Sequence, residues 1–166
     1  MKEINIIDFG LMGKQISALF YLLGYEIGVY NKSKLNIYEF EKQIKLLQRK
    51  IDFSNFNAGK INIYQHIEDL KNSLTIESLN EDLNLKKEIM QILRDNNIVF
   101  SNSSSLSMDD LNCDFIHFFN TIYIKLIELC GSNLERFTPL KDLKKLGFHI
   151  ICSKGNRGAL ANLLLF

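Results

Sequence analysis

The sequence predicts one α/β domain with a doubly wound, mainly parallel β-sheet, and three observations support this prediction. Its 166 residues are enough for a single domain with a sizeable core. Short apolar strand patterns alternate with helical patterns along most of the chain. Residues 3–30 read as a strand, a glycine turn, a helix and a second strand, which form a parallel βαβ unit. Ligands of such folds bind at the carboxyl ends of the strands.

The first elements are separated by glycines. Residues 3–7 alternate and then run apolar, which predicts a strand. After Gly10, apolar residues at helical spacing predict a helix over residues 11–23, and Gly24 ends it. A second short strand is expected at once, over residues 26–30.

The middle of the chain continues the alternation. Apolar residues three and four positions apart, among charged ones, predict a helix with one buried face over residues 37–51. Turn composition at residues 54–60 separates this helix from a strand pattern at 61–64. A further strand is expected at 74–78, and a helix at 83–95.

The last third begins with a strand at residues 98–101 and a serine-rich turn at 102–105. The hydroxyls of this turn suit the capping of a helix over residues 106–111. The remaining elements follow the same patterns: strands at 115–119 and 123–129, a helix at 138–146 and a strand at 148–152.

Composition argues against several classes of partner. Twenty Lys and Arg residues balance nineteen Asp and Glu, so the net charge of +1 offers no phosphate-binding face, and no nucleic acid partner is expected. No apolar run is long enough for a membrane span, and the acidic Glu3 and Asp8 do not fit a signal peptide, so we expect a cytoplasmic protein. Cys113, Cys130 and Cys152 match neither a disulfide set nor a metal motif, and we expect buried thiols and no metal.

The first strand-to-helix turn resembles the dinucleotide-binding fingerprint GxGxxG, with Asp8 in place of the first glycine. The two remaining glycines let the backbone approach a pyrophosphate and let the helix pack on the strand. We therefore expect a Rossmann-like cofactor site at Gly10, Leu11, Met12 and Gly13. A carboxylate about 4 Å from a phosphate would oppose binding by roughly 4 kcal/mol at an effective dielectric near 20. The alternative is a glycine turn that binds no ligand.

Asn31 ends the second strand, where a dinucleotide-binding domain usually has an acid that accepts hydrogen bonds from the ribose hydroxyls. Asn31, Lys32 and Ser33 offer an amide donor, an ammonium and a hydroxyl, which match a 2′-phosphate better than hydroxyls. NADP is therefore an alternative to NAD at this place. A simple solvated loop is the other interpretation.

A second polar group comes from three later segments. The serine turn follows one strand, His117 lies on the next strand, and Glu128 lies on the strand after that. Together they would supply a hydroxyl, a base and an orienting carboxylate at one edge of the sheet. The simpler interpretation of His117, between Ile and Phe, is a histidine of the core.

These motifs, in this order, resemble the NAD-binding domain of the L-3-hydroxyacyl-CoA dehydrogenases, from Ile4 nearly to Phe166. The shared landmarks are the turn at 10–13 and the segments 77–82, 101–106, 117–120 and 125–128. The resemblance implies an oxidoreductase of fatty acid metabolism that uses NAD or NADP. It adds Glu77 to the cofactor-binding residues Gly10, Leu11, Met12, Gly13, Asn31 and Lys32.

The resemblance also implies roles for the polar side chains. Ser104 would hydrogen-bond the 3-oxygen of a 3-hydroxyacyl-CoA thioester, His117 would move its proton, and Glu128 would hold the imidazole. Asn102 would line the substrate site. Asn162, in the segment 158–162, would support the substrate carbonyl.

Several features depart from the family pattern. They are Asp8, Asn31, a shortened segment before Leu74, and a turn after His117 that lacks two prolines and one residue. The resemblance further implies that residues 1–166 are the dinucleotide-binding domain and that residues 159–166 open a helical domain, so that a homodimer or a partner chain would complete the site. A second hypothesis is a binding or regulatory module, or a truncated relic, that no longer binds the cofactor.

Overall fold

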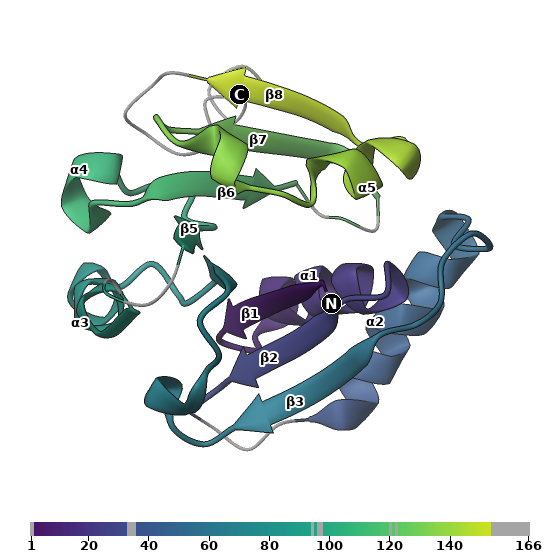
Figure 1. Ribbon diagram of the computed structural model, residues 1–166, viewed down its shortest axis with the longest axis horizontal. Helices are drawn as coiled ribbons and strands as arrows, with labels where there is room; N and C mark the ends of the chain where they lie inside the picture. The colour runs from purple at the N-terminus through teal and green to yellow at the C-terminus, as the bar shows by residue number, and fades with distance from the viewer. Residues whose placement is uncertain are drawn as a thin grey trace.

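The computed structural model describes residues 2–32, 36–93, 95, 98–119, 121 and 123–153. This part of the chain builds an eight-stranded sheet with helices packed on it (Figure 1). The strands are β1 (Glu3–Ile7), β2 (Glu26–Tyr30), β3 (Lys60–Tyr64), β4 (Leu74–Glu77), β5 (Ile98–Ser101), β6 (Asp114–Phe118), β7 (Leu126–Cys130) and β8 (His149–Ser153). The helices are α1 (Leu11–Leu22), α2 (Ile37–Lys50), α3 (Leu83–Leu93), α4 (Met108–Leu111) and α5 (Leu140–Lys145), with short 3₁₀ turns at Ile67–Asp69 and Leu134–Arg136.

The strand order in the sheet is β3-β2-β1-β4-β5-β6-β7-β8. Neighbouring strands run parallel except β6 and β7, which pair antiparallel. The chain therefore builds the sheet outward in one direction from β1 and then in the other from β4. A ligand crevice in such a sheet lies at the carboxyl ends of the strands where the order reverses. The predicted doubly wound, mainly parallel Rossmann-like fold is confirmed, and the reversal places the candidate site beyond Ile7 and Glu77.

Apolar side chains cover both faces of the sheet. On one face, Ile6 belongs to a buried cluster with Phe20 of α1 and Leu47 of α2. On the other face, Ile7 clusters with Ile89 of α3. Because successive side chains of a strand point to opposite faces, these two neighbouring isoleucines serve two different clusters. Full burial of a side chain such as Phe20 contributes roughly 1.5–3 kcal/mol, so this packing fixes α1 against β1.

Two helix starts differ in their capping. The Asn36 side chain accepts a hydrogen bond of 3.2 Å from the Glu39 N–H and caps α2. The short α4 begins later than predicted, because Ser107 and Asp110 form a reciprocal capping box there. The serines of residues 102–105 therefore do not cap this helix, and they serve the neighbouring site instead.

Some expectations about the end of the chain need correction. The strand predicted over residues 123–129 begins only at Leu126, and the helix predicted from Thr138 begins at Leu140, just after Pro139. Cys130 is buried and Cys113 is partly buried, but Cys152 is exposed on the edge strand β8, so the expectation of three buried thiols is wrong. Within the described ranges, the helices are too short or too polar to cross a membrane.

Candidate active site

The carboxyl ends of β1, β2, β4 and β5 bring four segments to one edge of the sheet. These segments are the turn after β1, the residues after β2, the polar stretch after β4 and the serine turn after β5, and they include most of the predicted site residues. The register of β1 with β4 and of β4 with β5 aligns these ends, because Ile7 pairs with Glu77 and Glu77 pairs with Ser101.

Asp8 adopts the left-handed backbone conformation that the first glycine of the fingerprint would provide. Its φ is 74°, and one carboxylate oxygen, Oδ2, accepts a hydrogen bond of 3.0 Å from the Gly10 N–H. Asp is tolerated in this conformation because its short side chain bonds the backbone locally. The backbone of the turn thus keeps the conformation that a glycine would allow, and the carboxylate points toward the Gly10 N–H.

Gly13 is required by the close approach of α1 to the end of β1. A Cβ atom at this position would lie only 2.1 Å from the Asp8 carbonyl oxygen. Beside it, the Ser78 hydroxyl donates to the Ile7 carbonyl at 3.2 Å. This glycine therefore has the packing role that the fingerprint assigns to it.

The first turn of α1 retains backbone donors that suit a phosphate group. The earliest intrahelical bond runs from the Lys14 N–H to the Gly10 carbonyl at 3.1 Å. The N–H groups of Leu11, Met12 and Gly13 precede it and lie at the positive end of the helix. These backbone donors therefore suit a dinucleotide pyrophosphate, whereas the Asp8 carboxylate bonded inside the turn opposes one.

Asn31 anchors the turn from the end of β2. Its Oδ1 accepts a hydrogen bond of 3.1 Å from the Phe9 N–H. The oxygen expected to face a ribose hydroxyl is therefore already bonded to the turn. Lys32 is exposed beside it, and Ser33 lies outside the described residues.

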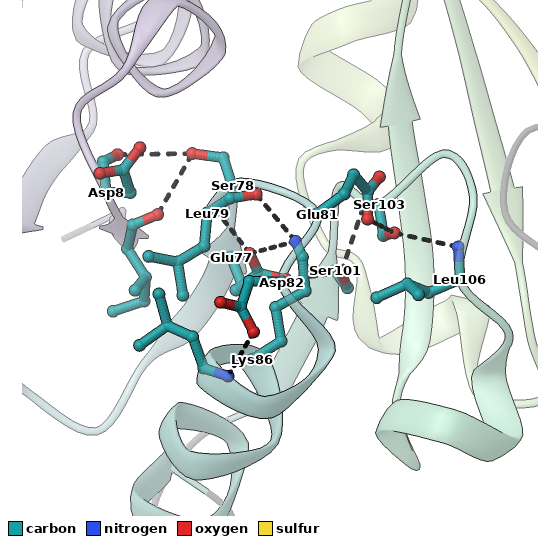
Figure 2. Close-up of polar contacts among 12 residues, drawn as sticks. Asp8, Glu77, Ser78, Leu79, Glu81, Asp82, Lys86, Ser101, Ser103 and Leu106 are labelled. Carbon is teal, nitrogen blue, oxygen red and sulfur yellow. Dashed lines mark hydrogen bonds and ion pairs between the residues drawn. The ribbon is translucent and has the colours of Figure 1, made fainter.

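Glu77 does not reach the surface of the site, contrary to the expected cofactor contact. Its side chain is 0% exposed, and its carboxylate bonds the Lys86 ammonium at 2.7 Å and the Ser101 hydroxyl at 2.6 Å. It also accepts a hydrogen bond from the Leu79 N–H (Figure 2). Because every one of these partners is internal, Glu77 braces the ends of β4 and β5 instead of touching a ligand.

Glu81 is the acid that faces the serine turn. Its carboxylate accepts hydrogen bonds from the Ser103 hydroxyl at 2.6 Å, the Ser104 N–H at 2.8 Å and the Ser104 hydroxyl at 3.3 Å. Burial would raise the pKa of Glu81, but these bonds more than offset it and hold the pKa below its usual value. Sequence reasoning missed Glu81 because two acids four residues apart, Glu77 and Glu81, share one polar segment. Both acids precede α3, which begins at Leu83 after Asp82, and the sequence alone does not show that Glu77 is buried while Glu81 faces the serine turn.

His117 and Glu128 face each other across the antiparallel β6–β7 ladder, as directly paired residues. Glu128 is buried, and its carboxylate accepts a hydrogen bond of 3.1 Å from the Ser153 hydroxyl. The His117 ring packs on Phe119 with the ring centroids 4.1 Å apart. Its buried Nδ1 has no hydrogen-bond partner among the described residues, so the close His117–Glu128 bond implied by the resemblance is not formed in this arrangement.

Burial lowers the pKa of His117, and the carboxylates of Glu128 and Glu81 partly oppose this by raising it. The imidazole is therefore neutral at physiological pH and able to accept a proton. Glu81 thus acts on both predicted groups: its carboxylate accepts a hydrogen bond from the Ser104 hydroxyl, and its charge raises the pKa of His117.

Asn102 positions the strand that carries the histidine. Its Oδ1 accepts a hydrogen bond of 3.0 Å from the Phe118 N–H. Its own N–H donates to the Glu77 carbonyl at 2.7 Å, which links β4 and β6 across the end of β5. The predicted Asn162 lies outside the described residues.

The chain is similar to several proteins of known family. A family model described as the NAD binding domain of 3-hydroxyacyl-CoA dehydrogenase matches residues 3–144. A 3-hydroxybutyryl-CoA dehydrogenase of Clostridioides difficile is 27% identical in an alignment 157 residues long, and the match covers 80% of this chain and 55% of that protein. This chain thus spans about half the length of that curated relative.

Solved structures share the fold. The (S)-3-hydroxybutyryl-CoA dehydrogenase of Ralstonia eutropha superposes with a TM-score of 0.78 at 22% identity, covering 99% of this chain and 68% of its own. FadB2 of M. tuberculosis superposes with a TM-score of 0.79 at 21% identity and the same coverage, 99% and 68%. The fingerprint turn, the strand order and the match over residues 3–144 agree, and the chain belongs to the family of 3-hydroxyacyl-CoA dehydrogenase NAD-binding domains.

Proposed function

We propose that this chain acts in an NAD(P)-dependent oxidoreductase that interconverts 3-hydroxyacyl-CoA and 3-oxoacyl-CoA. The observation that carries the proposal is the register of the β6–β7 ladder, which sets His117 directly opposite Glu128, next to Phe118, whose N–H bonds Asn102 of the serine turn. A buried acid opposite a half-buried histidine is the arrangement that a proton-transfer site needs.

The turn at Gly10–Gly13 would hold the cofactor pyrophosphate, and Lys32 beside Asn31 would meet a 2′-phosphate if one is present. A nicotinamide bound there would supply the hydride chemistry, taking up the hydride that leaves C3 of the alcohol or supplying it in the reverse direction. The side chains of the protein would bind and orient the substrate and move the proton.

His117 takes the hydroxyl proton during oxidation of the alcohol. Its lowered pKa leaves the ring neutral at physiological pH, so it is ready to act as a base. Glu128 then stabilises the imidazolium that forms, because its carboxylate favours the charged ring. Base catalysis of this kind contributes about 10²- to 10⁴-fold to a rate.

Ser104 would bind the substrate oxygen after exchanging partners. Its hydroxyl now donates to Glu81 at 3.3 Å, which is a long and readily replaced hydrogen bond. The Ser104 N–H holds Glu81 more closely, at 2.8 Å, so the loop stays in place while the hydroxyl turns. Ser104 is exposed and can meet a ligand, whereas Ser103 is buried.

The test is the reduction of acetoacetyl-CoA by NADH and by NADPH, followed by absorbance, with wild-type protein and a His117→Gln variant. We expect the variant to lose about 100-fold or more in kcat, because the base is removed. The matched control is His66→Gln, which alters an exposed histidine in a distant turn and keeps the wild-type rate. Equal rates for wild type and His117→Gln would refute the proposed role of the histidine.

The second candidate is a dinucleotide-fold module that has lost cofactor binding and serves in binding or regulation. The observation that favours it is the Asp8 carboxylate inside the phosphate turn. Calorimetric titration with NADH and NADPH separates the two candidates, since a well-folded chain that binds neither cofactor supports the module. Sedimentation at the same concentrations tests the further proposal that a homodimer completes the site.

A further inference from the structure

We propose that Asp8 is the specificity-determining residue of the cofactor turn: its carboxylate, bonded to the Gly10 N–H, disfavours ligands that bring a diphosphate. This inference rests on the proposed function, because it concerns the same turn. It goes further by naming the group that sets which ligands the turn accepts.

The first step is the charge at the start of α1. The N-terminus of a helix carries roughly half a positive elementary charge and attracts anions. No acidic residue lies in the first turn of α1, and Gly10 offers no side chain to cap it. The Asp8 carboxylate supplies the missing negative charge through its 3.0 Å bond with the Gly10 N–H. A negative charge of the protein itself therefore lies beside the N–H groups that would meet a ligand phosphate.

The second step is that the backbone of the turn cannot easily move aside. The Asp8 N–H donates to the Tyr30 carbonyl at 2.9 Å, and the Phe9 N–H donates to Asn31 at 3.1 Å. The Ser78 N–H donates to the Ile7 carbonyl at 3.0 Å. A ligand with a diphosphate must then displace the carboxylate by rotation of its side chain alone, or bind next to it.

The third step is the size of the effect. Two negative charges about 4 Å apart near a protein surface repel strongly enough to weaken binding by roughly two to three powers of ten. The displaced carboxylate also loses its bond with Gly10. Both effects apply to a diphosphate, and neither applies to an uncharged nucleoside, so the ligand classes are affected unequally.

The experiment compares four purified proteins: wild type, Asp8→Asn, Asp8→Gly and Asp52→Asn. Asp52 is a matched control, because its carboxylate also accepts a hydrogen bond, of 2.8 Å, from the N–H two residues later in an exposed turn. Calorimetry measures the Kd of each protein for NADH, NADPH, ADP and adenosine. Amide NMR follows the Gly10 N–H, and thermal unfolding checks that each variant is folded.

We expect both Asp8 variants to bind NADH, NADPH and ADP at least tenfold more tightly than wild type, with adenosine binding unchanged. The control Asp52→Asn keeps the wild-type constants. In the NMR spectrum, the Gly10 amide signal shifts in Asp8→Gly without ligand, because its acceptor has been removed.

Several results would overturn the inference. If wild type binds NADH and the Asp8 variants bind it equally well, the inference fails and the proposed function stands. If no folded variant binds NADH or NADPH, both fail. If Asp8→Gly gains affinity but Asp8→Asn does not, or if adenosine gains as much as ADP, then the carboxylate charge is not the determinant.

Discussion

The Lys86 ammonium and the Glu77 carboxylate form an ion pair of 2.7 Å in which the side chains are 1% and 0% exposed (Figure 2). The ammonium also donates to the Leu79 carbonyl at 2.9 Å, and the carboxylate accepts from the Ser101 hydroxyl. The pair therefore ties the end of β4 to α3 and to the end of β5. Through Ser101 the pair holds the start of the serine turn, and it lies too deep to contact a ligand.

Replacement of Lys86 by Met should destabilise the protein by about 3–5 kcal/mol, because it leaves a buried carboxylate without its cation. Urea unfolding followed by circular dichroism measures the change. The neighbouring Lys87→Met is the control, since Lys87 is exposed and should change stability by less than about 0.5 kcal/mol. A Lys86→Met variant as stable as the control would show that the pair contributes little.

Replacement of Glu128 by Gln should lower the pKa of His117 further. Burial already lowers this pKa, and the Glu128 carboxylate is one of the charges that oppose the shift. NMR titration of the His117 ring protons measures it. Glu135→Gln, which alters an exposed acid of a distant 3₁₀ turn, should leave the titration unchanged. A raised pKa in Glu128→Gln would contradict the electrostatic coupling.

The stability of the protein should depend on His117 in mildly acidic solution. In the folded state its pKa lies below the ordinary value of 6.5, so the unfolded chain binds the proton more readily. The contribution to stability is complete above pH 6.5 and is lost as the pH falls through that value toward the folded pKa. Unfolding free energies measured from pH 8 to pH 5 should show a shallower decline in His117→Gln than in wild type. The variant His149→Gln, at an exposed position, should behave as wild type does.

A methyl group at Gly13 should disrupt the start of α1. In Gly13→Ala the new Cβ would meet the Asp8 carbonyl oxygen at 2.1 Å, and both backbones would have to separate. We expect a loss of about 1–3 kcal/mol or more. Gly10→Ala is the informative comparison, because its Cβ would meet only the end of the Asp8 side chain, at 2.9 Å, and not backbone. Thermal unfolding should rank Gly13→Ala well below Gly10→Ala, and the opposite order would argue against this packing.

Most of the fold was predictable from the sequence because the periods of strands and helices differ and glycines separate them. The strands β1 and β2 have the predicted bounds, and the parallel pairing of β1 with β2 follows from the βαβ pattern. The convergence of the candidate site residues of β1, β2, β4 and β5 was also predictable, since parallel strands end at a common edge. The separate roles of Glu77 and Glu81 were not, because burial at the end of a four-residue strand depends on what packs there. Likewise, no sequence pattern reveals that the Asp8 carboxylate turns inward to Gly10.

The antiparallel ladder of β6 and β7 has a consequence for the evolution of this protein. Side chains alternate between the two faces of a strand, so a slip of one residue in the pairing would place His117 and Glu128 on opposite faces of the sheet. Insertions and deletions in the connection between these strands leave that pairing intact as long as the strands keep their alignment. Loop length can therefore drift between relatives without separating Glu128 from His117, whereas a shift of one residue in the register of β7 against β6 would part them at once.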